Sequence, residues 1–470
     1  MAAGVGPTGC YNLGMSTALD EAIARLRDAT CGTEYENSLF LVGGYVRDKR
    51  LGIPPAEDLD LVLEGNACAL ASFLFRKGVS SHAPVLYPRF GTARIQVAGV
   101  PVEIVGARRE TYDPFSRKPH VVQTDLATDA LRRDFTVNTL LENLHTGEVS
   151  DPLGCGMDDL SRRVLRTPLD PHRTFRDDPL RMLRAVRLAC RLDFSIAQDC
   201  QEAIRAEAER LRIISGERIR DELTKMLTHP SAGTALRQLE SLGLLAAFAP
   251  ELQAMVGCEQ NWAHVHDVWE HTVVAVEALP PDASLPLRLA TLLHDVGKPL
   301  TKSVDEDGRI RFFDHQIAGL SPARAFLRRL KFPSDVIADT LELVRLHMRP
   351  GGYSPQWTDG AVRRLLRDAG KLFDDLLILC RADAAARRND IEVPDLDSLE
   401  ERARRVETDF HATDAKSPLT GREIMDALGI QPGDEVGRLK DELTEAVLDG
   451  RLAMGDKEGA LRMLRALHGE

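Results

Sequence analysis

The segment from Leu41 to Val62 constrains the fold of this chain more than any other part of its sequence. It begins with Leu-Val-Gly-Gly-Tyr-Val-Arg-Asp, which predicts a strand, a glycine pair and the first turn of a helix. A strand predicted at 59–63 follows, with Asp58 and Asp60 two positions apart at its start. Side chains two apart on a strand project to the same face, so both carboxylates should aim one way. A glycine pair leading into a helix offers backbone N–H groups that suit a phosphate.

Two carboxylates held this close repel each other unless a cation lies between them. Oxygen ligands suit Mg²⁺, and Glu103, in a strand predicted at 101–105, is a candidate third carboxylate. Such a set is typical of two-metal phosphoryl transfer, in which one ion activates a hydroxyl and the other holds a triphosphate. A lone Asp-x-Asp is more often a capped turn or an exposed strand. Its combination with Gly43-Gly44 and Glu103 favours the metal site.

The pattern of apolar residues predicts an α+β head followed by helices only. Strands at 39–42, 59–63, 92–97 and 101–105 alternate with helical segments in the first 150 residues, and no strand is predicted after Asp151. Helical spacing recurs at 177–191, 198–212, 215–228 and 231–243. The expected domains are a catalytic head at 1–150, a helical neck at 151–255, a third domain at 256–400 and a helical tail at 401–470.

Composition narrows the class of protein. No apolar run approaches the ~20 residues of a membrane span, and the N-terminus lacks the pattern of a secretory signal, so we expect a cytoplasmic protein without membrane contact. The eight cysteines form no Cys-x-x-Cys pair, which disfavours a zinc ribbon.

The net charge of the chain is −12, yet residues 162–220 hold 14 arginines against nine acidic residues. That stretch is a candidate phosphate-binding surface, or a helical surface of paired charges.

A second set of residues with metal-binding chemistry lies between 264 and 383. His271, the adjacent pair His294-Asp295, and Asp383 are each placed on or beside a predicted helix. Mixed nitrogen and oxygen ligands suit a divalent ion such as Mn, Ni, Fe, Zn or Mg, and a metal-bound water could then attack a phosphate ester. A single helical histidine is usually structural, so the prediction depends on the whole set.

The head resembles class II tRNA nucleotidyltransferases, within the DNA polymerase β-like nucleotidyltransferases. Five segments in order across residues 41–223 carry the resemblance. They are Gly43–Asp48 with Asp58 and Asp60; Leu131–Asn138, which reads Leu-Arg-Arg-Asp-Phe-Thr-Val-Asn; Asp151–Leu160; Asp177–Arg181; and Glu217–Leu223.

The resemblance implies that Asp58 and Asp60 hold the catalytic Mg²⁺ ions with support from Glu103. It implies that Asp178 and Arg181 pair with the Watson–Crick edge of C or A; as i and i+3 on a predicted helix they would share a face, although an Asp–Arg pair within the helix would look the same. The residues expected to bind the nucleotide are Gly43, Gly44, Arg47, Arg132, Arg133, Asp134, Asn138, Asp178, Arg181 and Arg184.

The second set resembles the HD phosphohydrolase superfamily. His271, His294, Asp295 and Asp383 match its pattern, and Lys298 matches a frequent extension of it. His315 and His347 stand where members with two metal ions have further histidines, which leaves one or two ions open.

Together the two resemblances imply an enzyme that adds C, C and A to the 3′ end of tRNA from CTP and ATP. The HD domain would add phosphatase or 2′,3′-cyclic phosphodiesterase activity. A polar loop at 107–119 favours the full CCA activity over addition of CC or of A alone. Poly(A) polymerase is an alternative, and so is an HD phosphohydrolase whose head only senses nucleotides. The sequence indicates neither the HD substrate and metal nor an oligomeric state.

Overall fold

A computed structural model of the chain describes residues 13–54, 58–111, 120–261, 264–388, 394–410 and 416–468. They form two compact units that divide between Ile214 and Ser215, inside the segment 151–255 that the sequence assigns to one neck. No helix in the described ranges is both long and apolar enough to cross a membrane.

The first unit contains a seven-stranded mixed sheet. Its order is β3-β4-β5-β2-β1-β8-β9, with β2 and β5 parallel and the other neighbouring pairs antiparallel. The strands are β1 (Leu39–Val42), β2 (Leu59–Leu63), β3 (Val85–Tyr87), β4 (Thr92–Val97), β5 (Val100–Gly106), β8 (Leu141–Asn143) and β9 (Val149–Ser150). The bounds of β1, β2 and β4 agree with the sequence prediction, because alternating apolar residues mark strands with one covered face.

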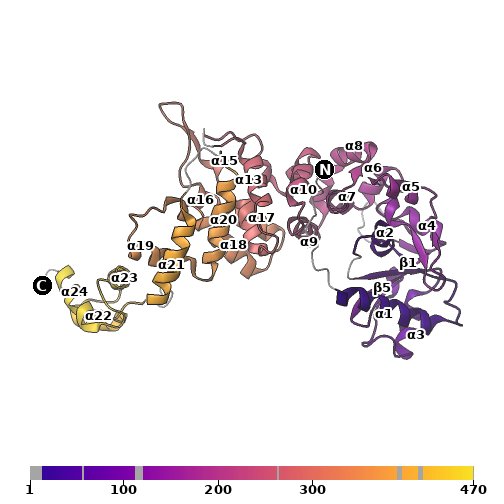
Figure 1. Cartoon of the computed structure of the whole chain (residues 1–470), viewed down its shortest axis with the longest axis horizontal. Helices are drawn as coiled ribbons and strands as arrows, with labels where there is room; N and C mark the ends of the chain where they lie inside the picture. Colours follow the sequence, from indigo (N-terminus) through magenta and orange to yellow (C-terminus); the bar gives the residue numbers. More distant parts are fainter. Residues whose placement is uncertain are drawn as a thin grey trace, which may run out of the picture. The chain divides into compact units, whose positions relative to one another are not determined.

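Helices α1 (Leu13–Thr30) and α3 (Ala67–Arg76) pack on one face of the sheet, against β4 and β5 (Figure 1). Asn66 caps α3 by accepting a hydrogen bond from the Ala69 N–H. Helix α2 (Gly44–Leu51) follows β1 directly and ends at Gly52, whose φ of 65° is the left-handed conformation that glycine adopts most easily. The sheet therefore presents its opposite face to the motif residues.

A separate ladder and a helical region complete the first unit. Strands β6 (Arg108–Thr111) and β7 (His120–Gln123) pair antiparallel, and most of the polar loop expected at 107–119 lies between them, outside the described residues. The remaining elements are α4 (Leu126–Leu131), α5 (Gly156–Ser161), β10 (Val164–Leu165), α6 (Pro171–Asp177), α7 (Leu180–Leu192), β11 (Ser195–Ile196) and α8 (Gln198–Glu207), with 3₁₀ turns at Thr136–Asn138 and Ala208–Ile213.

The second unit is almost entirely helical. Its elements are α9 (Gly216–Leu227), α10 (Ala232–Ser241), α11 (Leu245–Phe248), α12 (Pro250–Gln253), α13 (Val268–Glu277), α14 (Leu285–Leu293), α15 (Lys298–Thr301), β12 (Lys302–Val304), β13 (Ile310–Phe312), α16 (His315–Ala318), α17 (Leu320–Arg329), α18 (Ser334–Leu346), α19 (Asp359–Ala369), α20 (Phe373–Ala385), α21 (Leu396–Phe410), α22 (Gly421–Leu428), α23 (Asp434–Leu448) and α24 (Lys457–His468). The last three helices share a small core that includes Ile424, Leu443 and Leu464.

The predicted fold class, an α+β head followed by helices, is confirmed. The expectation of no strand after Asp151 is wrong for two short ladders, the parallel pair β10–β11 and the hairpin β12–β13. Strands of two or three residues are too short to show a period in the sequence. The helix predicted at 177–191 is also wrong at its start, because Pro179 divides it into α6 and α7.

Candidate active sites

The two aspartates and Glu103 gather on one face of the sheet. Asp60 on β2 pairs in register with Glu103 on the parallel neighbour β5, and Asp58 precedes β2. Burial and the negative charges of Asp58 and Glu103 raise the pKa of Asp60 to about 6, although Arg133 and Arg184 oppose the shift. Burial and like charges therefore both disfavour an ionised Asp60 unless a cation lies beside it.

Gly43 lies against this cluster at the end of β1. Its φ is 77°, and a Cβ built on it would lie 3.1 Å from Asp60 Oδ2. A side chain at this position would be strained and would crowd the carboxylate, so the first glycine of the pair has a steric cause. The turn thus brings the N-terminus of α2 beside the carboxylates.

A divalent cation fits this donor set. The three carboxylates offer only oxygen ligands, and Gly43 leaves room next to Asp60. Burial and the acidic neighbours raise the pKa of Asp60, and a bound cation would oppose both effects. Asp58, Asp60 and Glu103 are the residues that would hold the ion.

Asp129 orients the two arginines of the second motif. This carboxylate is almost fully buried and accepts hydrogen bonds from Arg132 Nε at 2.9 Å and Arg133 Nη2 at 3.1 Å. The surrounding cations hold its pKa below the usual range, although burial opposes that shift. Asp129 was not among the predicted site residues. Asp129 lies on α4, three and four residues before the arginines that follow the helix, and this helical spacing could have indicated it.

Asp134 and Asn138 form the centre of a buried polar network. Asp134 Oδ2 accepts two hydrogen bonds from Arg184, at 2.9 Å from Nε and 2.5 Å from Nη2. Its Oδ1 accepts from Asn138 Nδ2 at 2.9 Å, and Asn138 Oδ1 in turn accepts from Arg47 Nη1 at 2.6 Å. Arg184 and Asn138 outweigh the cost of burial and hold the pKa of Asp134 well below its usual range.

The network continues to helix α7 through an ion pair that sequence reasoning did not identify. Asp48 is fully buried; its Oδ1 accepts from Arg47 Nε at 2.7 Å and Nη2 at 2.6 Å, and its Oδ2 accepts from Arg191 Nη2 at 2.7 Å. Arg47, which the resemblance assigns to the nucleotide, is 2% exposed and donates to Asp48 and Asn138. In this structure it joins α2 to the network, and its contact with a nucleotide stays a prediction.

Asp178 and Arg181 lie one turn apart, but not on one helix. Asp178 has extended backbone between α6 and α7, because a residue before proline is disfavoured in the helical conformation. The Asp178 carboxylate accepts from the Leu180 N–H, and the Arg181 N–H donates to the Asp178 carbonyl. The Arg181 side chain donates to the Arg132 carbonyl. The two residues remain close, although the argument from a shared helical face is wrong.

The second unit brings six side chains into one buried cluster. Two groups of three can each hold a metal ion, with ligand atoms within 4.8 Å of one another: His271, His294 and Asp383 in one group, and Asp295, His315 and His347 in the other. Asp295 lies between the groups, with Oδ2 3.2 Å from His294 Nε2 and Oδ1 3.3 Å from His315 Nε2. The two histidines that the sequence left open are thus part of the same cluster.

The charges of this cluster also fit metal ions. Burial and the nearby positive charge of His294 lower the pKa of His347 to about 3, so its imidazole is neutral and can act as a ligand. Burial disfavours a charged His294, yet Asp295 and Asp383 raise its pKa to about 10. The buried His294 Nε2 makes no hydrogen bond of normal geometry with the described residues. A cation beside it would satisfy both this atom and the aspartates.

A cavity of about 290 Å³ opens beside the six-residue cluster. Its lining includes Lys298, whose Nζ lies 2.6 Å from Asp295 Oδ2, and Arg387, which donates to Asp383. His264, absent from the sequence prediction, also lines the cavity and packs edge-on against His271 with ring centroids 4.7 Å apart. The cavity therefore combines candidate metal ligands with cations that suit a phosphate.

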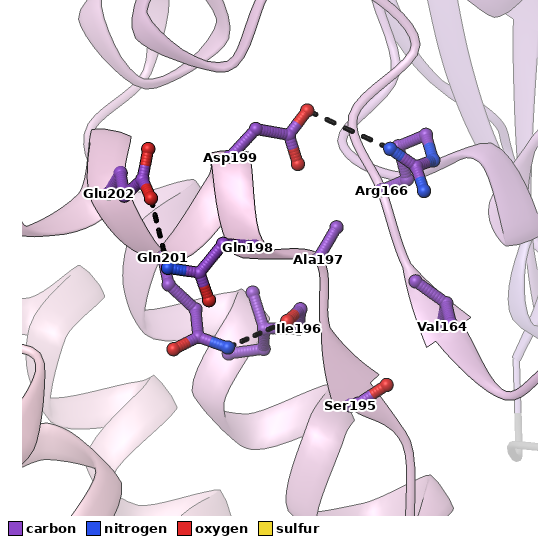
Figure 2. Close-up of a pocket in the computed structure, with 9 residues that line it drawn as sticks. All are labelled: Val164, Arg166, Ser195, Ile196, Ala197, Gln198, Asp199, Gln201 and Glu202. Atoms are coloured by element: carbon purple, nitrogen blue, oxygen red, sulfur yellow. Dashed lines mark hydrogen bonds and ion pairs between the residues drawn. The ribbon is translucent and has the colours of Figure 1, made fainter.

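A second cavity, of about 650 Å³, lies in the first unit where β10 and β11 meet the start of α8 (Figure 2). Arg166 and Asp199 face each other across it at 3.7 Å, and Gln201 bonds the Ile196 carbonyl. None of the predicted site residues lines it. Its polar groups are engaged with one another, so it offers no comparable chemistry.

Comparison with known proteins agrees with this geometry. Residues 39–166 match the poly A polymerase head domain, residues 193–255 the probable RNA and SrmB-binding site of polymerase A, and residues 261–388 the HD domain. The chain is 37% identical over 434 residues to the CC-adding tRNA nucleotidyltransferase of Thermus thermophilus, covering 90% of this chain and 92% of that one. It is 39% identical to the A-adding tRNA nucleotidyltransferase of Deinococcus radiodurans, covering 68% and 75%.

Two further matches agree. The multifunctional CCA protein of Xanthomonas campestris is 34% identical, with 74% of this chain and 85% of that one covered. The crystal structure of the Bacillus stearothermophilus CCA-adding enzyme in complex with CTP shares the fold with a TM-score of 0.68, at 24% identity over 96% and 98% of the two chains. The site geometry and the extent of these matches show that the chain belongs to the tRNA nucleotidyltransferases, a family of enzymes, and carries an HD domain.

Proposed function

We propose that this enzyme adds C, C and A to the 3′ end of tRNA from CTP and ATP without a nucleic-acid template. The observation that carries the proposal is the cluster of Asp58, Asp60 and Glu103 beside the Gly43 turn. Relatives named for CC addition, for A addition and for both support transfer to tRNA. Addition of CC alone is the second candidate, because the relative with that name matches over 92% of its length.

In this proposal Asp58, Asp60 and Glu103 hold Mg²⁺, the ion that suits an all-oxygen donor set. Bound Mg²⁺ would neutralise the charge that develops as the nucleotidyl group is transferred. The RNA 3′-hydroxyl forms a new bond to the α-phosphorus, the bond to pyrophosphate breaks, and the hydroxyl proton passes to solvent. The protein's own part is to hold both substrates in line at this cluster.

The arginines around the cluster would bind the triphosphate. Arg133 and Arg184 lie close enough to Asp60 to lower its pKa, which opposes the effect of the other carboxylates. Asp129 and Asp134 orient these arginines, so little side-chain entropy is lost when phosphate binds. Asp178 and Arg181 would select the base by hydrogen bonds to its edge.

An incorporation assay with labelled CTP and ATP tests the assignment. Three tRNAs are needed, which end just before the first C, before the second C and before the A. The proposal expects extension of all three to the full CCA end and no further. A CC-adding enzyme would stop before A, an A-adding enzyme would extend only the third tRNA, and a poly(A) polymerase would continue past one A. Extension of none of the three would refute the nucleotidyltransferase assignment.

For the HD domain we propose a phosphohydrolase that removes terminal phosphate from RNA ends or opens 2′,3′-cyclic phosphates to monoesters. Six buried candidate ligands beside a cavity with Lys298 and Arg387 support this function. Bound metal would supply the activated water for hydrolysis. Lys298 and Arg387 would bind the phosphate oxygens and orient the ester towards the cluster.

The six ligands favour two metal ions per HD domain. Metal analysis of the purified chain should give two ions after saturation with Ni and desalting, and one after substitution His347→Ala. Nickel suits imidazole ligands better than the all-oxygen set of the head. Asp178→Ala, in the first unit, serves as a matched control that leaves the count unchanged. A count of one in the wild type would show a mononuclear site.

A cytoplasmic location stays a prediction, because the relatives' names give the reaction and not the compartment.

A further inference from the structure

The outer strands of the first sheet leave one face open beside the carboxylates. Along β4 and β5 the side chains alternate: Ile95, Val102 and Ile104 are buried on the face that α1 and α3 cover. Arg94 and Glu103 lie on the other face, where the Arg94 side chain is 64% exposed. This second face is also the face of Asp60, because Asp60 and Glu103 are register partners.

One row of side chains crosses four strands from the carboxylates to the sheet edge. The register places Asp60 beside Glu103, Glu103 beside Arg94, and Arg94 beside Val85 on the edge strand β3. Side chains in register on neighbouring strands lie about 5 Å apart, so the row forms a continuous strip. Tyr87, two residues after Val85, extends the same face of β3.

The strip lies on the side of the carboxylates away from the Gly43 turn. Gly43 follows β1, which borders β2 on one side, while β5, β4 and β3 follow on the other. The network of Asp134, Asn138 and Arg47 is attached to α2, which begins at that turn. Arg184, which bonds Asp134, is therefore linked with this network to the β1 side, and Arg94 marks the β4 side.

A nucleotidyl transfer brings two polyanions to the same carboxylates from opposite directions. We propose that Arg94 and Tyr87 bind the unpaired 3′-terminal nucleotides of the RNA acceptor, an inference that rests on the proposed transfer to tRNA. Arg94 binds a backbone phosphate near the terminus, and Tyr87 stacks on a base. A basic groove with an aromatic platform is the usual way in which proteins hold single-stranded nucleic acid.

The side chains have the exposure that this role requires. Arg94 makes one ion pair with the described residues, to Glu103 at 3.3 Å, which is a long, single contact. Its remaining N–H donors are available to a phosphate, since a guanidinium carries five. Tyr87 and Val85 are 41% and 52% exposed on an edge strand, so stacking on them would cover apolar surface that water now contacts.

The test compares two RNAs and two classes of variant. One RNA is a tRNA that ends in CC; the other is the same tRNA cut back to the last base pair of the acceptor stem. Their affinities for the full-length enzyme are measured by fluorescence anisotropy, without nucleotide and with chelator, over a range of salt. Arg94→Ala and Tyr87→Ala probe the strip, and Tyr87→Phe retains stacking. The control, Arg76→Ala, removes a solvent-exposed arginine of α3, the helix that packs on the opposite face of the sheet.

The wild type should bind the CC-ending tRNA more tightly than the cut tRNA. Arg94→Ala should weaken binding of the CC-ending tRNA about tenfold and lower its salt dependence by the equivalent of about one phosphate contact, with little change for the cut tRNA. Tyr87→Ala should weaken the same complex about five- to tenfold, and Tyr87→Phe should restore it. Arg76→Ala should behave as the wild type does with both RNAs.

Equal losses for the two RNAs, or no loss, would overturn the inference. A rise in the KM for CTP with an unchanged KM for tRNA would also overturn it, because Arg94 would then act only by positioning Glu103. Failure of the inference differs from failure of the proposed function. If the wild type extends tRNA but Arg94→Ala binds both RNAs normally, only the strip is refuted; if the wild type extends no tRNA, the proposed function is refuted as well.

Discussion

Substitution Asp48→Ala should destabilise the first unit more than any single change on its surface. Asp48 is fully buried and accepts three hydrogen bonds, two from Arg47 and one from Arg191. Burial lowers the pKa of Arg47, and the negative charge of Asp48 opposes this shift. The carboxylate therefore stabilises the buried, charged guanidinium. Loss of one partner of a buried ion pair costs about 3–5 kcal/mol.

Arg191→Ala provides the matched comparison. Its side chain is 29% exposed and donates one of the three bonds, so its loss leaves Asp48 still paired with Arg47. We expect a cost of about 1–2 kcal/mol, the penalty for one unsatisfied carboxylate oxygen. In the double variant the two costs should not add, because both residues act on the same carboxylate.

The measurement must report on the first unit alone. All three tryptophans, at 262, 269 and 357, lie in the second unit, so their fluorescence would follow the wrong unit. Hydrogen exchange by mass spectrometry in increasing urea can instead follow peptides from α2 and α7, with peptides from α13 and α14 as an internal control. If Arg191→Ala destabilised α2 and α7 as much as Asp48→Ala, the buried pair would not have the role assigned to it.

Three further changes test other parts of the structure. Gly43→Ala should cost about 1–3 kcal/mol and reduce nucleotide incorporation at least tenfold, because φ is 77° and the new Cβ crowds Asp60; normal incorporation would contradict the steric argument. Arg288→Lys should destabilise the second unit by about 2–3 kcal/mol, measured in urea titrations followed by tryptophan fluorescence. The guanidinium donates to four backbone carbonyls, which an ammonium group cannot all reach. An unchanged stability would argue against those bonds. Asp134→Asn should cost more stability at pH 7 than at pH 3, measured by exchange in α7. The folded pKa of Asp134 lies below its unfolded value, so its contribution is complete above about pH 5 and declines as the pH falls towards the folded pKa; a cost independent of pH would show that its charge is unimportant.

The sequence predicted the catalytic head well where the information is local. Strand alternation predicted that Asp58 and Asp60 face one way, and the register of β2 with β5 brings the candidate third carboxylate, Glu103, beside Asp60. The prediction that Asp178 lies on a helix was wrong: its backbone is extended because Pro179 follows it, and this cause is visible in the sequence. That error matters little for the site, because Arg181 remains one turn away.

Residues that orient the site were harder to predict because their partners lie far away in the chain. The Asp48–Arg191 pair joins residues 143 positions apart, and the local partner of Asp48, Arg47, does not indicate from the sequence that either side chain is buried. Asp129 could have been found from its helical spacing to Arg132 and Arg133. Exposure of Arg94 and Tyr87 on an open sheet face follows only from the packing of α1 and α3 on the other face.

The most direct test of the central claim uses one variant in each active site of the full-length enzyme. Asp58→Ala should abolish addition of labelled CTP and ATP to tRNA and leave metal-dependent phosphate release unchanged, because the head carboxylates are proposed to serve nucleotidyl transfer alone. Asp295→Ala should abolish phosphate release and leave nucleotide addition unchanged. Loss of both activities in either variant, or addition of CTP by Asp58→Ala at the wild-type rate, would contradict the account.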